Sequence, residues 1–99
     1  MADAIVRGQA LRWVSDDQPG WVEVNLVDAD GDEHRIIEKA PVLTTVAFTS
    51  ASPFPAELWI KVDTGLVVGG RVHIMFAAAV ETTDGLRDMH MSVDDVVWL

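Results

Sequence analysis

The chain has 99 residues, no cysteine and a net charge of −9, since sixteen acidic side chains outnumber seven basic ones. The length predicts one domain over residues 1–99, and the lack of cysteine excludes disulfides and thiolate metal sites. Lys and Arg supply most of the affinity for phosphate groups. The charge therefore argues against nucleic acid and anionic membranes as partners and favours a basic protein surface or a cation.

The first part of the chain predicts three strands. Residues 4–14 mix apolar and polar side chains and predict the first strand, with Gly8 as a candidate bulge. Residues 21–28 alternate between apolar and polar, and Gly31 supplies the positive φ of a hairpin turn before residues 33–38 return. Alternate apolar side chains of this hairpin are therefore expected to point into one core.

Prolines limit the strands in the middle of the chain, because proline cannot donate a hydrogen bond to a ladder. Pro41 ends the hairpin, and residues 42–48 predict a short edge strand. Residues 49–55 contain two prolines and predict an extended loop. Residues 57–63 alternate again and predict another strand, which a turn at residues 63–65 ends.

The last third of the chain predicts a second hairpin. Residues 69–70, both glycine, turn or kink the chain before residues 71–80, the longest predicted strand. Three consecutive alanines in this segment would also suit a helix, but the spacing of its apolar residues by two favours a strand. An Asp-Gly turn at residues 84–85 predicts a return over residues 86–91.

The end of the chain and the number of strands predict the fold class. Ser92 predicts an N-capped helical turn, and residues 96–99 predict a closing strand. Six or seven short antiparallel strands predict an all-β fold, namely a small β-barrel of the SH3-like or OB-like kind, with a β-sandwich as the alternative. Ile36 and Ile37 are both apolar although they face opposite ways, which favours a barrel with a loop across one mouth.

The acidic hairpin tip at residues 28–33 resembles a calcium loop only superficially. With Gly31 at the sixth position of an EF-hand loop, the first and twelfth positions are Leu26 and Ile37, which cannot bind a cation. We therefore predict a solvated acidic turn at this tip.

Imidazole and thioether groups, which soft metals prefer, gather late in the chain. They belong to His73, Met75, Met89, His90 and Met91. Pairing the last hairpin on its Asp-Gly turn would place the two later methionines on the core face and leave the two histidines several residues apart. The sequence therefore predicts no metal site and no cofactor.

No catalytic residue is nominated by the sequence. Its serines lie outside any nucleophile motif, and its glycines form no phosphate loop. Adjacent carboxylates lie in predicted turns, where water keeps both of them ionised, whereas acid–base catalysis needs two different environments. An enzyme is therefore the less favoured interpretation.

Two tryptophans share the polar phase of their predicted strands. Trp21 alternates with Glu23, and Trp59 alternates with Lys61, so both rings are expected on the face away from the core. Tryptophan surrounded by charge is typical of binding hot spots, and these four residues are the predicted partner-binding site. The alternative is that residues 42–55 fold over the rings as a second small core.

A recurring pattern of turn and strand residues covers most of the chain. It consists of His34-x-Ile36-x-x-Lys39-Ala40-Pro41-Val42, preceded by Trp21-Val22-Glu23-Val24 and followed by Val80-Glu81-x-Thr83-Asp84-Gly85-Leu86. The pattern resembles a group of short, acidic, uncharacterised bacterial proteins rich in β-structure. The resemblance implies a bacterial stand-alone domain and carries over no functional residue.

Three functions agree with these features. The first is a protein-interaction module, for example an immunity-type inhibitor that meets a basic toxin by electrostatic steering. The second is a small-molecule binder or enzyme that uses the barrel mouth near residues 53–55, and the third is a homo-oligomer. The first residues show no signal-peptide pattern and no apolar run spans a bilayer, which predicts a cytoplasmic protein.

Overall fold

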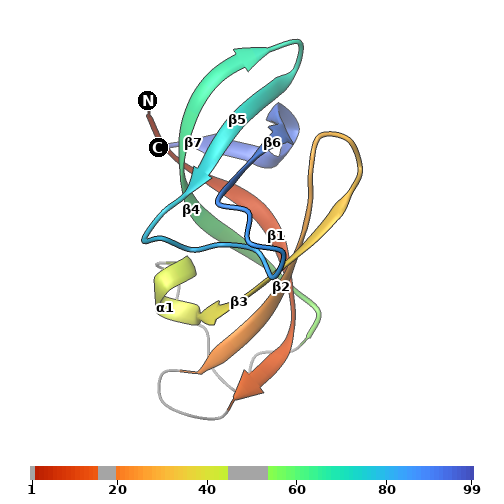
Figure 1. Cartoon of the computed structure of the whole chain (residues 1–99), viewed down its shortest axis with the longest axis vertical. Coiled ribbons are helices and arrows are strands. Elements are labelled where there is room, and N and C mark those ends of the chain that lie inside the picture. The colour runs from red at the N-terminus through yellow and green to blue at the C-terminus, as the bar shows by residue number, and fades with distance from the viewer. Residues whose placement is uncertain (1, 16–19, 45–53) are drawn as a thin grey trace.

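The computed structural model of the chain describes residues 2–15, 20–44 and 54–99 (Figure 1). Within these residues there are seven strands: β1 (Ala2–Ser15), β2 (Trp21–Val27), β3 (Glu33–Lys39), β4 (Ala56–Val68), β5 (Arg71–Phe76), β6 (Asp88–Ser92) and β7 (Val96–Trp98). The described helical elements are a single turn, α1 (Ala40–Leu43), and a 3₁₀ turn, η1 (Val93–Asp95).

The strands form one antiparallel sheet in the order β3-β2-β1-β4-β5-β6, and β7 pairs with β1 beside this path. The sheet curls into a half-barrel, and the last strand, β7, lies beside the first half of β1 (Figure 1). The predicted all-β fold and its antiparallel barrel are confirmed in this half-closed form. The described strands do not form the two packed sheets of a sandwich.

Strand β1 organises the sheet because both of its edges are paired. One edge pairs with β4 over residues 2–10. The other edge pairs with β7 over residues 4–6 and then with β2 over residues 9–15. Arg7 and Gly8 therefore lie between two separate ladders.

The inner face of the sheet carries the core. Its most deeply buried members include Val6, Val22, Val24, Leu26, Ile36, Ile60, Val72, Ile74 and Met91. A methyl group added at Gly8 would lie 3.0 Å from Val24 Cγ1 and 3.1 Å from Leu26 Cδ2. Gly8 is therefore a point of close approach within a regular ladder, and the predicted bulge there is wrong. The register shifts of β1 against β2 lie between Ala10 and Arg12 and between Trp13 and Ser15.

The two end strands of the sheet, β3 and β6, are connected through contacts of the β2–β3 hairpin tip. Ala29 donates its backbone N–H to the carbonyl of His90 in β6 over 2.8 Å. The guanidinium of Arg71 in β5 binds both carboxylate oxygens of Asp30, at 2.8 and 3.1 Å. These contacts partly close the open side of the curled sheet.

Three local predictions are confirmed. Gly31 has a φ of 85° at the β2–β3 turn, where a residue with a Cβ would be strained. The Ser92 hydroxyl accepts the backbone N–H of Asp94 at 3.3 Å and caps η1. The predicted closing strand is β7, which adds to β1.

The extents of β4 and β5 differ from the prediction. Strand β4 runs through the predicted turn at residues 63–65 to Val68, because an irregularity in its pairing with β5 accommodates the glycine without reversing the chain. Strand β5 ends at Phe76 instead of residue 80. The next residues leave the strand because two alanines, Ala78 and Ala79, adopt left-handed φ angles of 54° and 57°.

The segment after β3 also differs from the prediction. An edge strand was expected over residues 42–48, but Ala40–Leu43 forms α1, with Pro41 in its first turn. Residues 45–48 and the first part of the predicted loop, residues 49–53, lie outside the described residues. In the part that is described, no helix has the length and apolar character needed to cross a membrane.

Candidate partner-binding cleft

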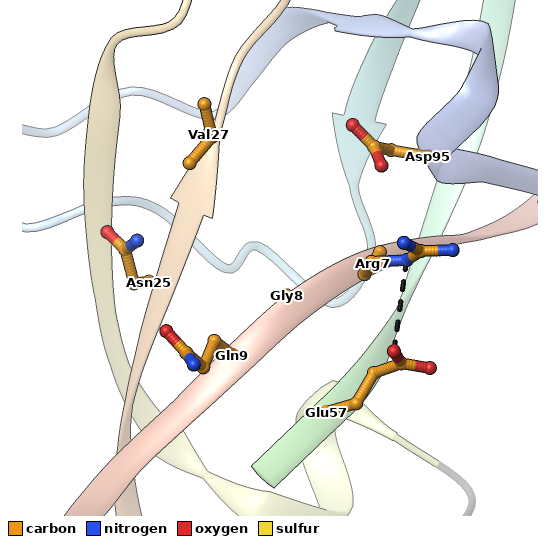
Figure 2. Close-up of a pocket in the computed structure, with 7 residues that line it drawn as sticks. All are labelled: Arg7, Gly8, Gln9, Asn25, Val27, Glu57 and Asp95. Atoms are coloured by element: carbon orange, nitrogen blue, oxygen red, sulfur yellow. Dashed lines mark ion pairs between the residues drawn. The ribbon is translucent and has the colours of Figure 1, made fainter. Parts of the chain in front are cut away.

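The gap between the two ladders on β1 is the floor of a cleft of about 320 Å³ (Figure 2). Its lining residues are Arg7, Gly8, Gln9, Asn25, Val27, Glu57 and Asp95. Asn25 and Val27 of β2 stand across the cleft from Arg7 and Asp95, and Glu57 lies beside Arg7 on β4, at the other edge of β1 (Figure 2). This volume lies at the lower end of the range found for ligand-binding sites.

Backbone groups of β1 face this cleft. Asp3 accepts the N–H of Leu99 at 3.0 Å, so its carbonyl points toward the β7 edge. Backbone groups alternate between the two edges of a strand, so the N–H and C=O of Arg7 face this same edge. The ladder with β7 ends at Val6 and the ladder with β2 begins at Gln9. The Arg7 backbone is therefore directed into the gap.

One rim of the cleft is a cluster of Arg7, Glu57 and Trp59. The register of β1 and β4 places Arg7 opposite Trp59, and the guanidinium carbon lies 5.3 Å from the ring centroid. Arg7 Nε lies 3.9 Å from Glu57 Oε2, and Trp59 Nε1 donates to Glu57 Oε1 at 2.8 Å. The positive charge of Arg7 is therefore already close to a carboxylate and an aromatic face.

The opposite wall is formed by Asn25 and Val27 of β2. Asn25 is only 9% exposed; its side-chain oxygen accepts from Arg35 Nη1, and its Nδ2 donates to Glu33 Oε1 at 3.4 Å. Both ends of this amide are occupied, so its orientation is fixed. The exposed Gln9, opposite Asn25 in the ladder, makes no side-chain hydrogen bond with the described residues.

Asp95 of η1 completes the cleft from the far end of the chain. The Ser92 cap sets the direction of η1, and Asp95 is half-buried against the cleft whereas its neighbour Asp94 is exposed and outside it. No cationic side chain of the described residues lies within ion-pair distance of Asp95. The lining thus has one more carboxylate than it has cations.

The predicted site residues lie on the outer face but do not form one cluster. Trp59 pairs across from Arg7, and Trp21 pairs across from Ser15, eight residues farther along β1. At a rise of about 3.3 Å per residue, the two tryptophans are on the order of 25 Å apart along the sheet. Of the two, Trp59 borders the cleft.

The other predicted site residues have their own local partners. Lys39 Nζ lies 5.5 Å from the ring centroid of Trp21, and Glu23 accepts from Arg12 Nε at 2.8 Å. Lys61 lines a different hollow, of about 270 Å³, near Leu99. Residues 45–53 lie outside the described residues, so the alternative of a second core over the rings stays a prediction.

None of the lining residues was predicted as a site residue. Among them, Arg7, Gln9, Asn25 and Asp95 lie on β1, β2 and η1. These residues come together only because β7 and β2 pair with the same edge of β1. The spacing of the four residues in the sequence does not predict that pairing. Gly8 carried a usable signal, since an isolated glycine in a strand marks either a bulge or a close approach. The cleft lies on the outer face, and the described residues of the predicted mouth, 54 and 55, do not line it.

The two histidines that were expected to be far apart are direct neighbours. His90 pairs with His73, with ring centroids 5.3 Å apart, and His73 Nε2 lies 2.9 Å from Asp88 Oδ2. The expected separation is wrong because β6 pairs with β5 itself and not with the loop that follows it. Met89 and Met91 are buried, as predicted. Within residues 2–15, 20–44 and 54–99, no three His, Asp or Glu side chains are arranged to hold a metal ion.

The acidic tip of the β2–β3 hairpin is organised around Asp28. Its Oδ1 accepts the backbone N–H groups of Asp30 and Asp32 at 2.9 and 3.0 Å, and its Oδ2 lies 2.7 Å from His34 Nε2. Burial raises the pKa of Asp28, but these hydrogen bonds outweigh burial and hold the pKa below its ordinary value. The first carboxylate of the predicted solvated turn is therefore largely buried and structural, with a side chain only 14% exposed.

No known protein-family model, curated protein or solved structure matches the chain. The resemblance to short acidic bacterial proteins therefore stays a prediction.

Proposed function

We propose that this protein is an interaction module that binds a basic protein through the outer face of its sheet, around Trp59 and the cleft. The observation that carries the proposal is the Arg7–Glu57–Trp59 cluster at the rim of an open hollow. Tryptophan and arginine are enriched in binding hot spots, and a ring held by two local partners loses little freedom when a partner covers it.

The charge of the chain supports a basic partner. The net charge of −9 would attract a basic protein over distances beyond direct contact and raise the association rate. Steering of this kind suits an immunity-type inhibitor, which must meet its toxin quickly. An inhibitor of a basic toxin is therefore the concrete form of interaction module that we propose.

The test is affinity purification from the organism of origin with wild-type protein, Trp59→Leu and a matched control, Trp98→Leu. Trp98 is 42% exposed on β7 and donates to Thr64 Oγ1, outside the cleft. We expect a basic protein in stoichiometric amount with the wild type and with Trp98→Leu, and its loss with Trp59→Leu. The affinity should also fall steeply as salt is raised.

Two results would contradict the proposal. One is that no protein binds in stoichiometric amount at low salt. The other is that Trp59→Leu and Trp98→Leu, both folded as judged by circular dichroism, retain the partner equally well.

Self-association is a second candidate function, favoured by the β4–β5 hairpin. This hairpin extends beyond the rest of the molecule (Figure 1), and its Leu66, Val67 and Val68 are 80%, 52% and 69% exposed. Consecutive exposed aliphatic side chains are typical of interaction surfaces. Light scattering at rising concentration should then show a dimer that Leu66→Ser abolishes, whereas a monomer at every concentration would exclude this function.

A further inference from the structure

We infer that the cleft receives one cationic side chain, a lysine or arginine presented by the partner protein, with Asp95 as its counterion. This inference rests on the proposed function and assigns a chemistry to its site. It is carried by the charges of the lining, by the hydrogen-bond acceptors at the floor and by the shape of the walls.

The charges of the lining favour a cation. Arg7 already lies against the Trp59 ring and 3.9 Å from Glu57, whereas Asp95 has no cationic neighbour within ion-pair distance among the described residues. A bound cation would give Asp95 the partner that it lacks. A bound anion would instead face two carboxylates, Glu57 and Asp95, with a single guanidinium to attract it.

The floor supplies acceptors in addition to the carboxylate. The register directs the backbone carbonyl of Arg7 into the gap between β7 and β2, and the side-chain oxygen of Gln9 is unengaged by the described residues. An ammonium has three donors and a guanidinium has five, so either needs several acceptors once it leaves water. Asp95, Arg7 and Gln9 together provide them.

The walls suit the aliphatic part of a long cationic side chain. Val27 is 43% exposed and lines the side of the cleft opposite Asp95 (Figure 2). Gly8 adds no side chain to the floor, so an entering chain can approach the β1 backbone closely. Lysine and arginine bury their methylene stems against such surfaces while their charged ends reach polar groups.

The experiment titrates ¹⁵N-labelled protein with N-acetyl-arginine methylamide and, as the neutral isostere, N-acetyl-citrulline methylamide. We expect saturable shifts of the Gly8, Gln9 and Asp95 amides with the arginine compound, and at least about tenfold weaker binding of the citrulline compound. This comparison needs no variant, so it does not depend on how any substitution folds.

A matched pair of variants then assigns the counterion. Asp95→Asn should weaken binding of the arginine compound about tenfold, whereas Asp94→Asn, the same change in the adjacent exposed residue, should leave it within about twofold. The inference is overturned if the citrulline compound binds equally well. It is also overturned if both variants have the same effect, since general attraction to an acidic surface would then explain the shifts.

The partner protein obtained by affinity purification distinguishes the assignment of the cleft from the proposed function. If that partner is lost with Trp59→Leu but binds Asp95→Asn as tightly as the wild type, the cleft assignment is wrong and the interaction module stands. If the arginine compound binds as expected and no basic partner exists, the cleft does bind a cationic side chain, but the proposed function and the partner as the source of that side chain are wrong.

Discussion

The two long hairpins of the molecule, β2–β3 and β4–β5, share a topology, but the tip of the first is polar and the tip of the second is apolar. At the β2–β3 tip, Asp28 gathers backbone N–H groups and His34, and Asp30 is bound by Arg71. At the β4–β5 tip, the turn is formed by two glycines with positive φ, and the aliphatic side chains before it are exposed. The polar tip thus closes the sheet, whereas the apolar tip presents a surface.

Truncating a leucine should lower the free energy of unfolding far more in the β2–β3 hairpin than in the β4–β5 hairpin. Leu26 of β2 is fully buried, so Leu26→Ala should lower the free energy of unfolding by about 2–5 kcal/mol through lost burial and a cavity. Urea unfolding of the variant and the wild type measures this difference. A loss below about 1 kcal/mol would show that the core under this hairpin collapses freely around the missing atoms.

Removal of the organising carboxylate should have the next largest effect. Asp28→Ala leaves two backbone N–H groups and the His34 ring without their acceptor, which should lower the free energy of unfolding by about 2–3 kcal/mol. The control is Asp32→Ala, whose side chain is exposed in the same turn and which should remain within about 0.5 kcal/mol of the wild type. Equal losses would mean that the tip is not organised by Asp28.

Acid should weaken the β2–β3 tip selectively. The pKa of Asp28 in the folded chain is held below its ordinary value of 3.8, so this carboxylate stays ionised in the fold when the unfolded chain already takes up a proton. Its stabilisation is complete above pH 3.8 and disappears as the pH falls through the folded pKa. The difference in unfolding free energy between wild type and Asp28→Asn, followed by urea unfolding at each pH, should therefore shrink below pH 3.8. A constant difference would contradict this role.

The ion pair that ties the polar tip to β5 should contribute less. Both Arg71 and Asp30 are substantially exposed, so Arg71→Ala should lower the free energy of unfolding by at most about 1 kcal/mol, and less in high salt. Its specific signature is faster hydrogen exchange of the Ala29 amide, which bonds to β6 at the same tip. Arg87→Ala breaks another exposed ion pair and should leave that amide unchanged.

The smallest effect is expected at the apolar tip. Leu66 is 80% exposed, so Leu66→Ala should change the free energy of unfolding by no more than about 0.5 kcal/mol, in contrast to Leu26→Ala. A clear loss of stability that depends on protein concentration would show that this tip is covered by a second copy in solution.

The parts of the fold that depend on neighbouring residues could be predicted from the sequence. Alternation located the cores of β2, β3 and β4, and Gly31 fixed the first hairpin because its turn requires a positive φ. The left-handed Ala78 and Ala79 could not be predicted, since alanine rarely adopts that conformation and carries no signal for it. Because these two residues end β5 at Phe76, the predicted end of that strand and the predicted pairing partner of His90 were both wrong.

The cleft could not be predicted because it depends on pairing between distant segments. Trp59 was expected on the outer face from its phase alone, but its cluster with Arg7 depends on the register between β1 and β4. Asp95 reaches the same hollow only because β7 adds to the edge of β1 that β2 leaves unpaired. Such long-range registers are set by the whole core and not by any local pattern.

The placement of β7 makes binding in the cleft depend on the pairing between β7 and β1. The floor of the cleft belongs to β1, and Asp95 in its wall directly precedes the short strand β7. A guest that touches both Asp95 and the β1 floor can bind only while β7 stays paired with β1. Occupancy would therefore suppress fraying at this seam, and slower deuterium uptake by Val96 and Val97 would report it even if no other part of the molecule moved.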